Sequence, residues 1–84
     1  MSESEQRMID YITQEVIHRP SVHIDLDTQL VSSGLIDSFA LVDVLLQLED
    51  VTNMRIPAGK VRAQDMNTIR LMFALAYRLG KPRK

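Results

Sequence analysis

The sequence contains no cysteine and no tryptophan, and only two tyrosines and two phenylalanines are aromatic. Without cysteine the chain can form neither a disulfide nor a thiolate metal site, and any thiol that it uses must come from a cofactor. The core must be built from aliphatic and methionine side chains. The only histidines, His18 and His23, show no clear ligand spacing with carboxylates, so we expect no metal site.

Long apolar runs are also missing. None approaches the roughly 20 residues of a membrane span, and Met1-Ser2-Glu3-Ser4-Glu5 lacks the basic and apolar regions of a signal peptide. We therefore expect no membrane insertion and a cytoplasmic location. The 84 residues, 45% apolar and 25% charged, suit one globular domain. The domain is expected to span 1–84, with 81–84 as a flexible basic tail too short to predict nucleic-acid binding.

The net charge of −1 hides an uneven distribution. Residues 1–50 hold ten acids and two bases, whereas residues 51–84 hold one acid and eight bases. One interpretation is that opposite faces of a bundle attract each other, with solvent screening the rest. The other is that two differently charged surfaces meet two different partners. The sequence leaves both open.

Hydrophobic periodicity predicts three main helices, at 4–19, 38–52 and 67–79, and a single turn at 61–64. The connection 20–37 is too long for a simple link between helices, and its apolar residues predict an irregular loop held against the core. No stretch shows the alternation of paired strands. The sequence therefore predicts an all-α, four-helix bundle with three main helices, one short helix and a long first loop.

Local signals mark the ends of these helices. Ser2 and Glu5 have the spacing of a capping box, and Pro20 requires the first helix to stop. Asn67 is the expected N-cap of the last helix, and Gly80 its expected stop.

The second helix is apolar around most of its circumference. Its polar residues Asp43, Gln47 and Asp50 fall at i, i+4 and i+7 and form one narrow stripe. Such a helix is predicted to be nearly surrounded by other elements, with one acidic edge in water. This pattern favours a central helix that also presents a docking surface.

A serine hydroxyl stands where the long loop becomes this helix, in the motif Gly34-Leu35-Ile36-Asp37-Ser38. Gly34 is predicted to take a backbone conformation that other residues resist. On spacing alone, Ser38 could simply cap the helix. The segment from Leu30 to Ser38, however, resembles the prosthetic-group attachment site of acyl carrier proteins. The resemblance runs from about residue 25 to residue 79, and its other matching positions are Leu48, Glu49, Ile56 and Pro57.

This resemblance implies that Ser38 carries 4′-phosphopantetheine, transferred from coenzyme A by a separate phosphopantetheinyl transferase that supplies Mg²⁺ and a base. The protein would not catalyse a reaction itself. It would hold an acyl group as a thioester and deliver it, as a monomer, between ligases, synthases and transferases of a fatty-acid, polyketide or related pathway. The resemblance also implies docking to basic patches of these partners through four acids, each of which could equally belong to a solvated face: Asp37, Asp43, Glu49 and Asp50.

Several positions depart from the housekeeping fatty-acid carriers. Ala40 replaces a usual acid and Thr52 a usual core aromatic, while a typically acidic stretch contains Arg55, Lys60 and Arg62. Stand-alone carriers of dedicated pathways tolerate such changes, so an aminoacyl carrier of the D-alanyl type is an alternative. An alternative of another class is a helical interaction module whose basic C-terminal half binds an anionic partner.

An apolar cargo would need a dry site. We expect an acyl chain to fold back between the second and last helices, because aliphatic and methionine side chains can open there at modest cost. A small polar cargo would instead stay in solvent. The expected lining consists of Leu41, Val42, Leu45, Leu46, Met72 and Ala76.

Overall fold

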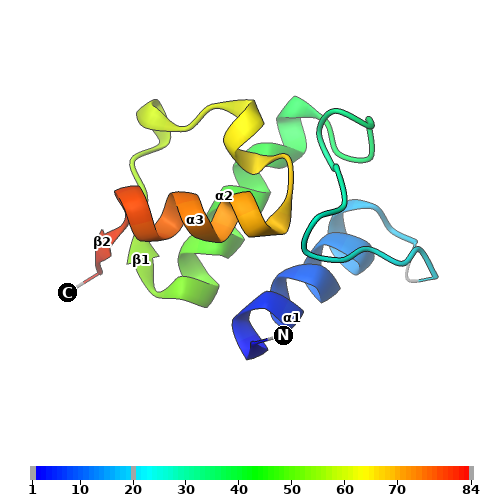
Figure 1. Ribbon diagram of the computed structural model, residues 1–84, viewed down its shortest axis with the longest axis horizontal. Helices are drawn as coiled ribbons and strands as arrows, with labels where there is room; N and C mark the ends of the chain where they lie inside the picture. The colour runs from blue at the N-terminus through cyan, green and yellow to red at the C-terminus, as the bar shows by residue number, and fades with distance from the viewer. Residues whose placement is uncertain (1, 20, 84) are drawn as a thin grey trace.

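The computed structural model describes residues 2–19 and 21–83. Its main elements are three helices, α1 (Glu3–Tyr11), α2 (Ser38–Thr52) and α3 (Ile69–Leu79). In Figure 1, α2 runs behind α3, and the long first loop lies at the opposite side of the molecule from the chain's C-terminal end. This arrangement confirms the predicted all-α bundle with three main helices and a long first loop.

The first helix begins as predicted but ends differently. The Ser2 hydroxyl accepts from the backbone N–H of Glu5 (3.1 Å), and the Glu5 carboxylate accepts from the N–H of Ser2 (2.8 Å), which completes a capping box. The second bond is the main reason why the pKa of Glu5 is lowered. The helix then widens into a π-helical turn, Ile12–Val16. The predicted stop signal, Pro20, lies outside the described residues.

Helix α2 has the predicted bounds, but its surroundings differ from the prediction. Its buried face, formed by Val44, Leu48 and Val51, belongs to the core shared by the three helices. The opposite face carries large apolar side chains in solvent. The expectation that other elements nearly surround α2 is therefore wrong, because three helices and a loop are too few to cover it on all sides.

Asn67 is not the N-cap of α3. The Thr68 hydroxyl accepts from the N–H of Leu71 (3.0 Å) and so caps the helix. The side-chain oxygen of Asn67 instead accepts from the N–H groups of Val31 and Ser32, both at 2.9 Å. Asn67 therefore ties the first loop to the start of α3, a long-range role that local capping preferences do not predict.

The segment between α2 and α3 contains two 3₁₀ turns, Ala58–Lys60 and Ala63–Met66, where the sequence predicted one turn at 61–64. It also contains a short strand that the sequence did not predict. β1 (Met54–Arg55) pairs antiparallel with β2 (Lys81–Pro82). Strands of two residues are too short to show alternation in a sequence.

This pairing involves part of the predicted basic tail, whose last residue, Lys84, is not described. Gly80, the predicted helix stop, permits the pairing. A Cβ atom at Gly80 would collide with the carbonyl oxygen of Ala76 and lie 2.8 Å from Met54 Sδ. The end of α3 can therefore approach β1 closely only because this residue is glycine.

The core is aliphatic and rich in methionine, as predicted. Phe73 is its one aromatic member among the described residues, only 5% exposed. None of the described helices has the length and apolar character needed to cross a membrane. The largest fully buried side chains are Met8, Ile12, Leu30, Val44, Leu48, Met66, Ile69, Met72 and Leu75.

Candidate functional site

Ser38 is the first residue of α2, and its side chain is exposed. The helix is capped by Asp37, whose carboxylate accepts from the N–H of Ala40 (2.9 Å). Among the described residues the Ser38 hydroxyl makes no hydrogen bond. Ser38 is thus not the cap that its position could suggest, and its hydroxyl remains available for chemistry.

The loop before Ser38 is fixed on both sides of a turn. Leu30 is fully buried and donates its N–H to the carbonyl oxygen of Asn67 (2.7 Å). Gly34 has φ +82°, a left-handed conformation that favours glycine, as predicted. Ile36 is 3% exposed and donates to the carbonyl oxygen of Leu30 (3.1 Å). Two buried anchors therefore hold a turn that presents Ser38 at the surface.

The start of α2 suits an anion but supplies no base. Backbone N–H groups of a first helical turn lack partners within the helix, and the helix dipole favours negative charge there. Asp37 uses one of these groups and adds its own negative charge beside the site. No described histidine or carboxylate hydrogen-bonds the Ser38 hydroxyl, so the described residues place no general base in contact with it.

The exposed face of α2 combines apolar and acidic residues. Phe39, Val42 and Leu46 are 90%, 62% and 57% exposed. With exposed Asp43 and Asp50 they fall within about one third of the helix circumference. We call these five residues the mixed face. The sequence did not lead us to expect its apolar members in solvent, since Val42 and Leu46 were predicted to line a cargo site. The signal was that α2 has more apolar positions than one buried face can hold.

The four acids proposed for docking differ in their contacts. Asp37 caps α2, and Glu49 accepts from the N–H of Ile56 (2.7 Å), which fixes the chain after the helix. Asp50 pairs with Arg83 (3.3 Å) at the far end of α2 from Ser38. Asp43 alone of the four has no side-chain hydrogen bond or ion pair within the described part of the chain.

Asp43 also acts on α1. The pKa of Tyr11 is raised by burial of its ring and by the negative charges of Asp43 and Glu15. By its position along the helix, Asp43 lies at the border of the mixed face.

A small apolar cleft, with a volume of about 180 Å³, lies beside α2. Leu41, Val42 and Leu45 form one wall, and the segment 58–66 forms the other. The cleft thus contains three of the predicted lining residues but lies between α2 and the segment 58–66 rather than between α2 and α3. Met72 and Ala76 are fully buried in the core, while Leu46 points into solvent on the mixed face. Residues on the second wall are Ala58, Val61, Arg62, Ala63 and Met66.

Comparison with protein families gives one match. Residues 8–74 match the family model described as the phosphopantetheine attachment site. No curated protein and no solved structure matches the chain. The family's covalent cofactor is 4′-phosphopantetheine, and its members are carriers that work with a phosphopantetheinyl transferase and other partner enzymes. Because the match covers well over half of the sequence, the chain belongs to this family of phosphopantetheine-bearing carrier proteins.

Proposed function

We propose that Ser38 is the attachment residue and that the protein carries an acyl group. The observation that supports this most directly is an exposed hydroxyl at the first position of α2, left without a partner because Asp37 makes the cap. When bound, 4′-phosphopantetheine supplies a thiol that holds the cargo as a thioester. The chain has no cysteine, so this cofactor thiol would be the group that bonds to the cargo.

The attachment reaction uses Ser38 as a nucleophile. Its Oγ forms a bond to the β-phosphorus of coenzyme A, the bond from that phosphorus to the oxygen of the departing 3′,5′-ADP breaks, and the serine proton passes to a base of the transferase. The resulting phosphodiester anion would lie beside the first N–H groups of α2, where the helix dipole favours it. Buried anchors at Leu30 and Ile36 would keep the hydroxyl in place for the transferase.

An acyl cargo is favoured over an aminoacyl cargo by the apolar cleft. Its wall of Leu41, Val42 and Leu45 begins within one turn of Ser38 along α2. The cleft is smaller than the usual pocket for a drug-sized ligand, so we expect it to cover a short apolar segment rather than a long chain. A D-alanyl-type cargo would gain little from this lining.

We propose that partner enzymes bind to the mixed face. Apolar side chains at Phe39, Val42 and Leu46 can be buried in a complex, and Asp43 can meet a basic group at its edge. Asp37 and Glu49 are assigned mainly to holding the start of α2 and the chain after it, while Asp50 belongs to the mixed face but pairs with Arg83. The proposed docking surface thus has fewer available acidic side chains and more exposed apolar side chains than the sequence alone predicted.

Mass spectrometry tests the attachment residue. The purified chain is incubated with coenzyme A, Mg²⁺ and a broad-specificity phosphopantetheinyl transferase, and we expect one phosphopantetheine adduct. The adduct should disappear in Ser38→Ala and persist in Ser32→Ala, a matched variant whose exposed hydroxyl bonds to Gln29 in the same loop. An adduct that survives Ser38→Ala would disprove the assignment. No adduct at all would favour the non-carrier interaction module.

Methyl chemical shifts test the cargo. Carrying a short acyl group, the protein should show shifts at Leu41, Leu45 and Met66 relative to the thiol form, whereas Met72 in the core should not move. Shifts confined to Ser38 and its neighbours would rule out the cleft and favour an aminoacyl cargo that stays in solvent.

Kinetics of a loading enzyme test the docking face. Leu46→Glu should raise the KM of that enzyme without unfolding the protein, because it places charge in the apolar part of the mixed face. Leu71→Glu is the matched control, since Leu71 is similarly exposed (44%) but lies on α3. Equal effects of the two substitutions would argue for docking elsewhere.

A further inference from the structure

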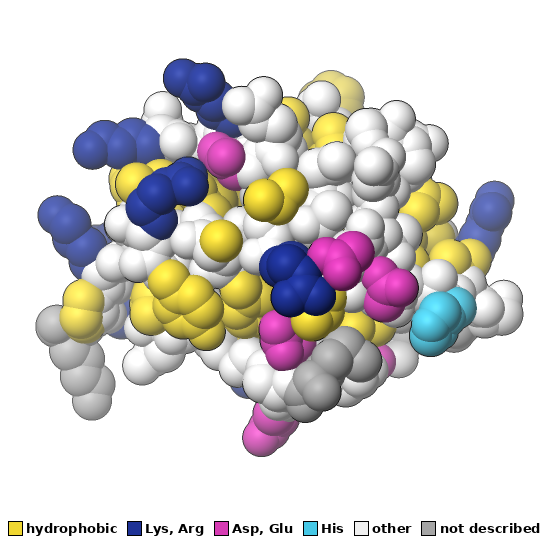
Figure 2. Space-filling model, in the orientation of Figure 1, with side chains coloured by type: hydrophobic (Ala, Val, Ile, Leu, Met, Phe, Trp, Pro, Cys, Tyr) yellow, Lys and Arg dark blue, Asp and Glu magenta, His cyan; other side chains and the backbone are white. Residues whose placement is uncertain are grey.

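A second surface of the molecule has the opposite character from the Ser38 site. A hollow of about 600 Å³ lies where β1, β2, the turn Ala58–Lys60 and the end of α3 meet. Figure 2 shows most of the Lys and Arg side chains of this view gathered over the same end of the molecule. We call it the basic hollow, and its lining residues are Arg55, Pro57, Lys60, Arg78, Leu79, Lys81, Pro82 and Arg83.

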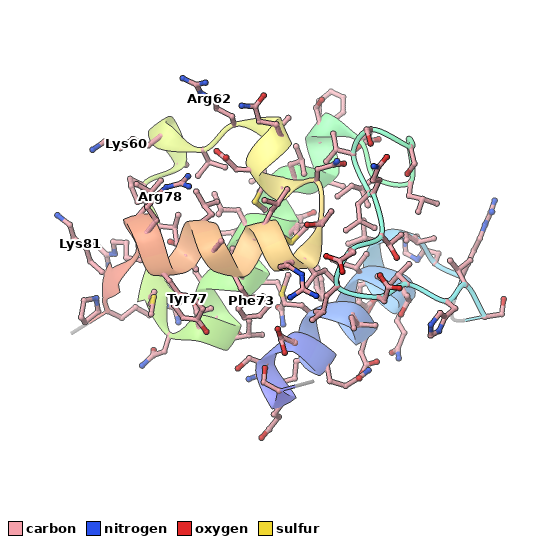
Figure 3. The ribbon with its side chains drawn as sticks, viewed as in Figure 1. Lys60, Arg62, Phe73, Tyr77, Arg78 and Lys81 are labelled. Carbon is pink, nitrogen blue, oxygen red and sulfur yellow. The ribbon has the colours of Figure 1, made fainter. Side chains whose placement is uncertain are left out.

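Internal ion pairs neutralise this hollow only in part. Arg78 lies 3.7 Å from a carboxylate oxygen of Asp65, and Arg83 lies 3.3 Å from one of Asp50. Within the described residues the structure records no ion pair for the other cations, Arg55, Lys60 and Lys81. Figure 3 shows Lys60, Arg78 and Lys81 on one side of the molecule, although they come from three different elements. The fold thus concentrates positive charge that the chain itself does not balance.

The lining between these cations is apolar. Pro57, Leu79 and Pro82 contribute carbon surface, and none of the lining residues is aromatic. The aromatic pair on α3, Phe73 and Tyr77, with ring centroids 6.4 Å apart, is not part of the hollow. A ligand that fits must therefore combine negative charge with an aliphatic group.

From this combination we infer that the basic hollow binds an acidic segment of a partner polypeptide, with carboxylates on both sides of an aliphatic side chain. Arginine and lysine can pair with the carboxylates, and the apolar floor can cover the aliphatic group. A membrane surface fits less well because the cations line a concavity rather than a protruding face. Single-stranded nucleic acid usually gains affinity by stacking on aromatic side chains, which this lining lacks.

This interaction would leave Ser38 accessible. The hollow lies at the C-terminal end of α2, and the 15 residues of that helix separate it from the serine. At the usual rise per residue this is about 22 Å. A partner bound in the hollow could therefore hold the carrier while another enzyme uses Ser38.

Fluorescence anisotropy tests the inference. The probe is a labelled synthetic peptide in which glutamates flank a central leucine, added to the full chain at low salt, and we expect binding that weakens as salt is raised. A peptide with glutamine in place of glutamate should not bind, and one with serine in place of leucine should bind more weakly. Absence of binding, or equal binding of all three peptides, would overturn the proposal.

Charge-matched variants locate the site. The double substitution Lys60→Glu with Lys81→Glu should weaken peptide binding at least about tenfold, because two attractions are replaced by repulsions. The control, Arg7→Glu with Arg19→Glu, changes the net charge equally at exposed positions outside the hollow. Equal weakening by the control would show that only net charge matters and would contradict a defined site.

Competition identifies the ligand class. Tripolyphosphate, single-stranded DNA and vesicles of an anionic phospholipid are added separately to the peptide complex at the same concentration of charge. The inference requires unlabelled peptide to compete better than all three. Better competition by DNA or vesicles would assign the hollow to that macromolecule instead, and better competition by tripolyphosphate would reduce it to a general anion site.

Discussion

The two ends of α2 differ in how the chain builds them. At the serine end, comprising Ser38 and the loop 30–37, buried Leu30 and Ile36 carry a turn that leaves a neutral hydroxyl in solvent. At the basic end, the chain leaves α2 through Asn53, whose left-handed φ of 55° turns it into β1. There the last residues of the protein return to pair with the strand.

This difference shows how a small protein can present two unlike surfaces. The serine end is organised by a few buried anchors, as would suit the proposed attachment site. The basic end is organised by pairing of distant segments and collects cations from four parts of the chain. The length of α2 separates Ser38 from the basic hollow, although the turn Ala58–Lys60 contributes Lys60 to the hollow and Ala58 to the apolar cleft beside α2.

The largest expected effect comes from Leu30→Ala. Removing a fully buried side chain from the loop should lower the free energy of unfolding by about 2–5 kcal/mol. Under conditions where the variant remains folded, amide exchange should accelerate most in the loop before Ser38, while peptide binding in the basic hollow persists. Denaturant titration measures the stability, and hydrogen exchange locates the change.

Leu35→Ala provides the matched control in the same loop. Leu35 is 37% exposed, so its truncation should cost much less than that of Leu30. Equal losses would mean that the loop is not held by the anchor that the structure shows.

Gly80→Ala should act at the basic end. The added methyl group would collide with the Ala76 carbonyl and crowd Met54, which we expect to cost about 1–3 kcal/mol and to separate β2 from β1. Peptide binding should fall, whereas phosphopantetheine attachment to Ser38 should proceed at its usual rate. Gly59→Ala is the control, because nothing lies within 4 Å of a Cβ atom there. A slower attachment in Gly80→Ala would show that the two ends are coupled.

Asp37→Ala should have a smaller effect, confined to the serine end. Loss of the cap to the Ala40 N–H should lower the free energy of unfolding by about 1 kcal/mol and increase exchange in the first turn of α2. Asp37→Ser keeps a capping oxygen and should restore most of the stability. If serine and alanine at this position were equally destabilising, charge rather than capping would explain the role of Asp37.

The smallest effect is expected from the ion pair between Asp27 in the first loop and Arg70 on α3 (2.7 Å). The hydrogen bond from Arg70 lowers the pKa of Asp27 below its ordinary value. The stabilisation is therefore present above that ordinary value and is lost as the pH falls through the lowered pKa. Both side chains are well exposed, so the effect on stability should be slight.

An NMR titration of the Asp27 carboxyl measures this directly. Arg70→Gln should return its pKa toward the ordinary range, while Arg78→Gln, which removes the cation paired with Asp65, should leave it unchanged. An unchanged Asp27 pKa in Arg70→Gln would show that the pair does not persist in solution.

Much of the fold could be predicted because its signals are local. The bounds of α2, the capping box at Ser2 and the left-handed Gly34 all follow from spacing and backbone preference. Features that depend on distant contacts could not. Two examples are the bond of Asn67 to the loop and the pairing of β1 with β2, which join residues far apart in the sequence. No local sequence pattern predicts such contacts.

The candidate site divides in the same way. The motif around Ser38 pointed to the family, which the family match then confirmed. The functions of the acids could not be read from the sequence, because Glu49 and Asp50 are engaged by a backbone N–H and a cation from other parts of the chain. Residue type predicted charge at these positions but not whether a partner could reach it.

The contact made by Asn67 has a consequence for how the protein is made. Its side-chain oxygen accepts from the N–H groups of Ser32 and Val31, which lie 35 and 36 positions earlier in the chain. These bonds can form only after the chain has closed a large loop. During synthesis, residue 67 must emerge before the segment leading to Ser38 can take its final shape. A transferase that requires this arrangement of the loop would therefore modify Ser38 only after residue 67 has emerged and bonded to the loop.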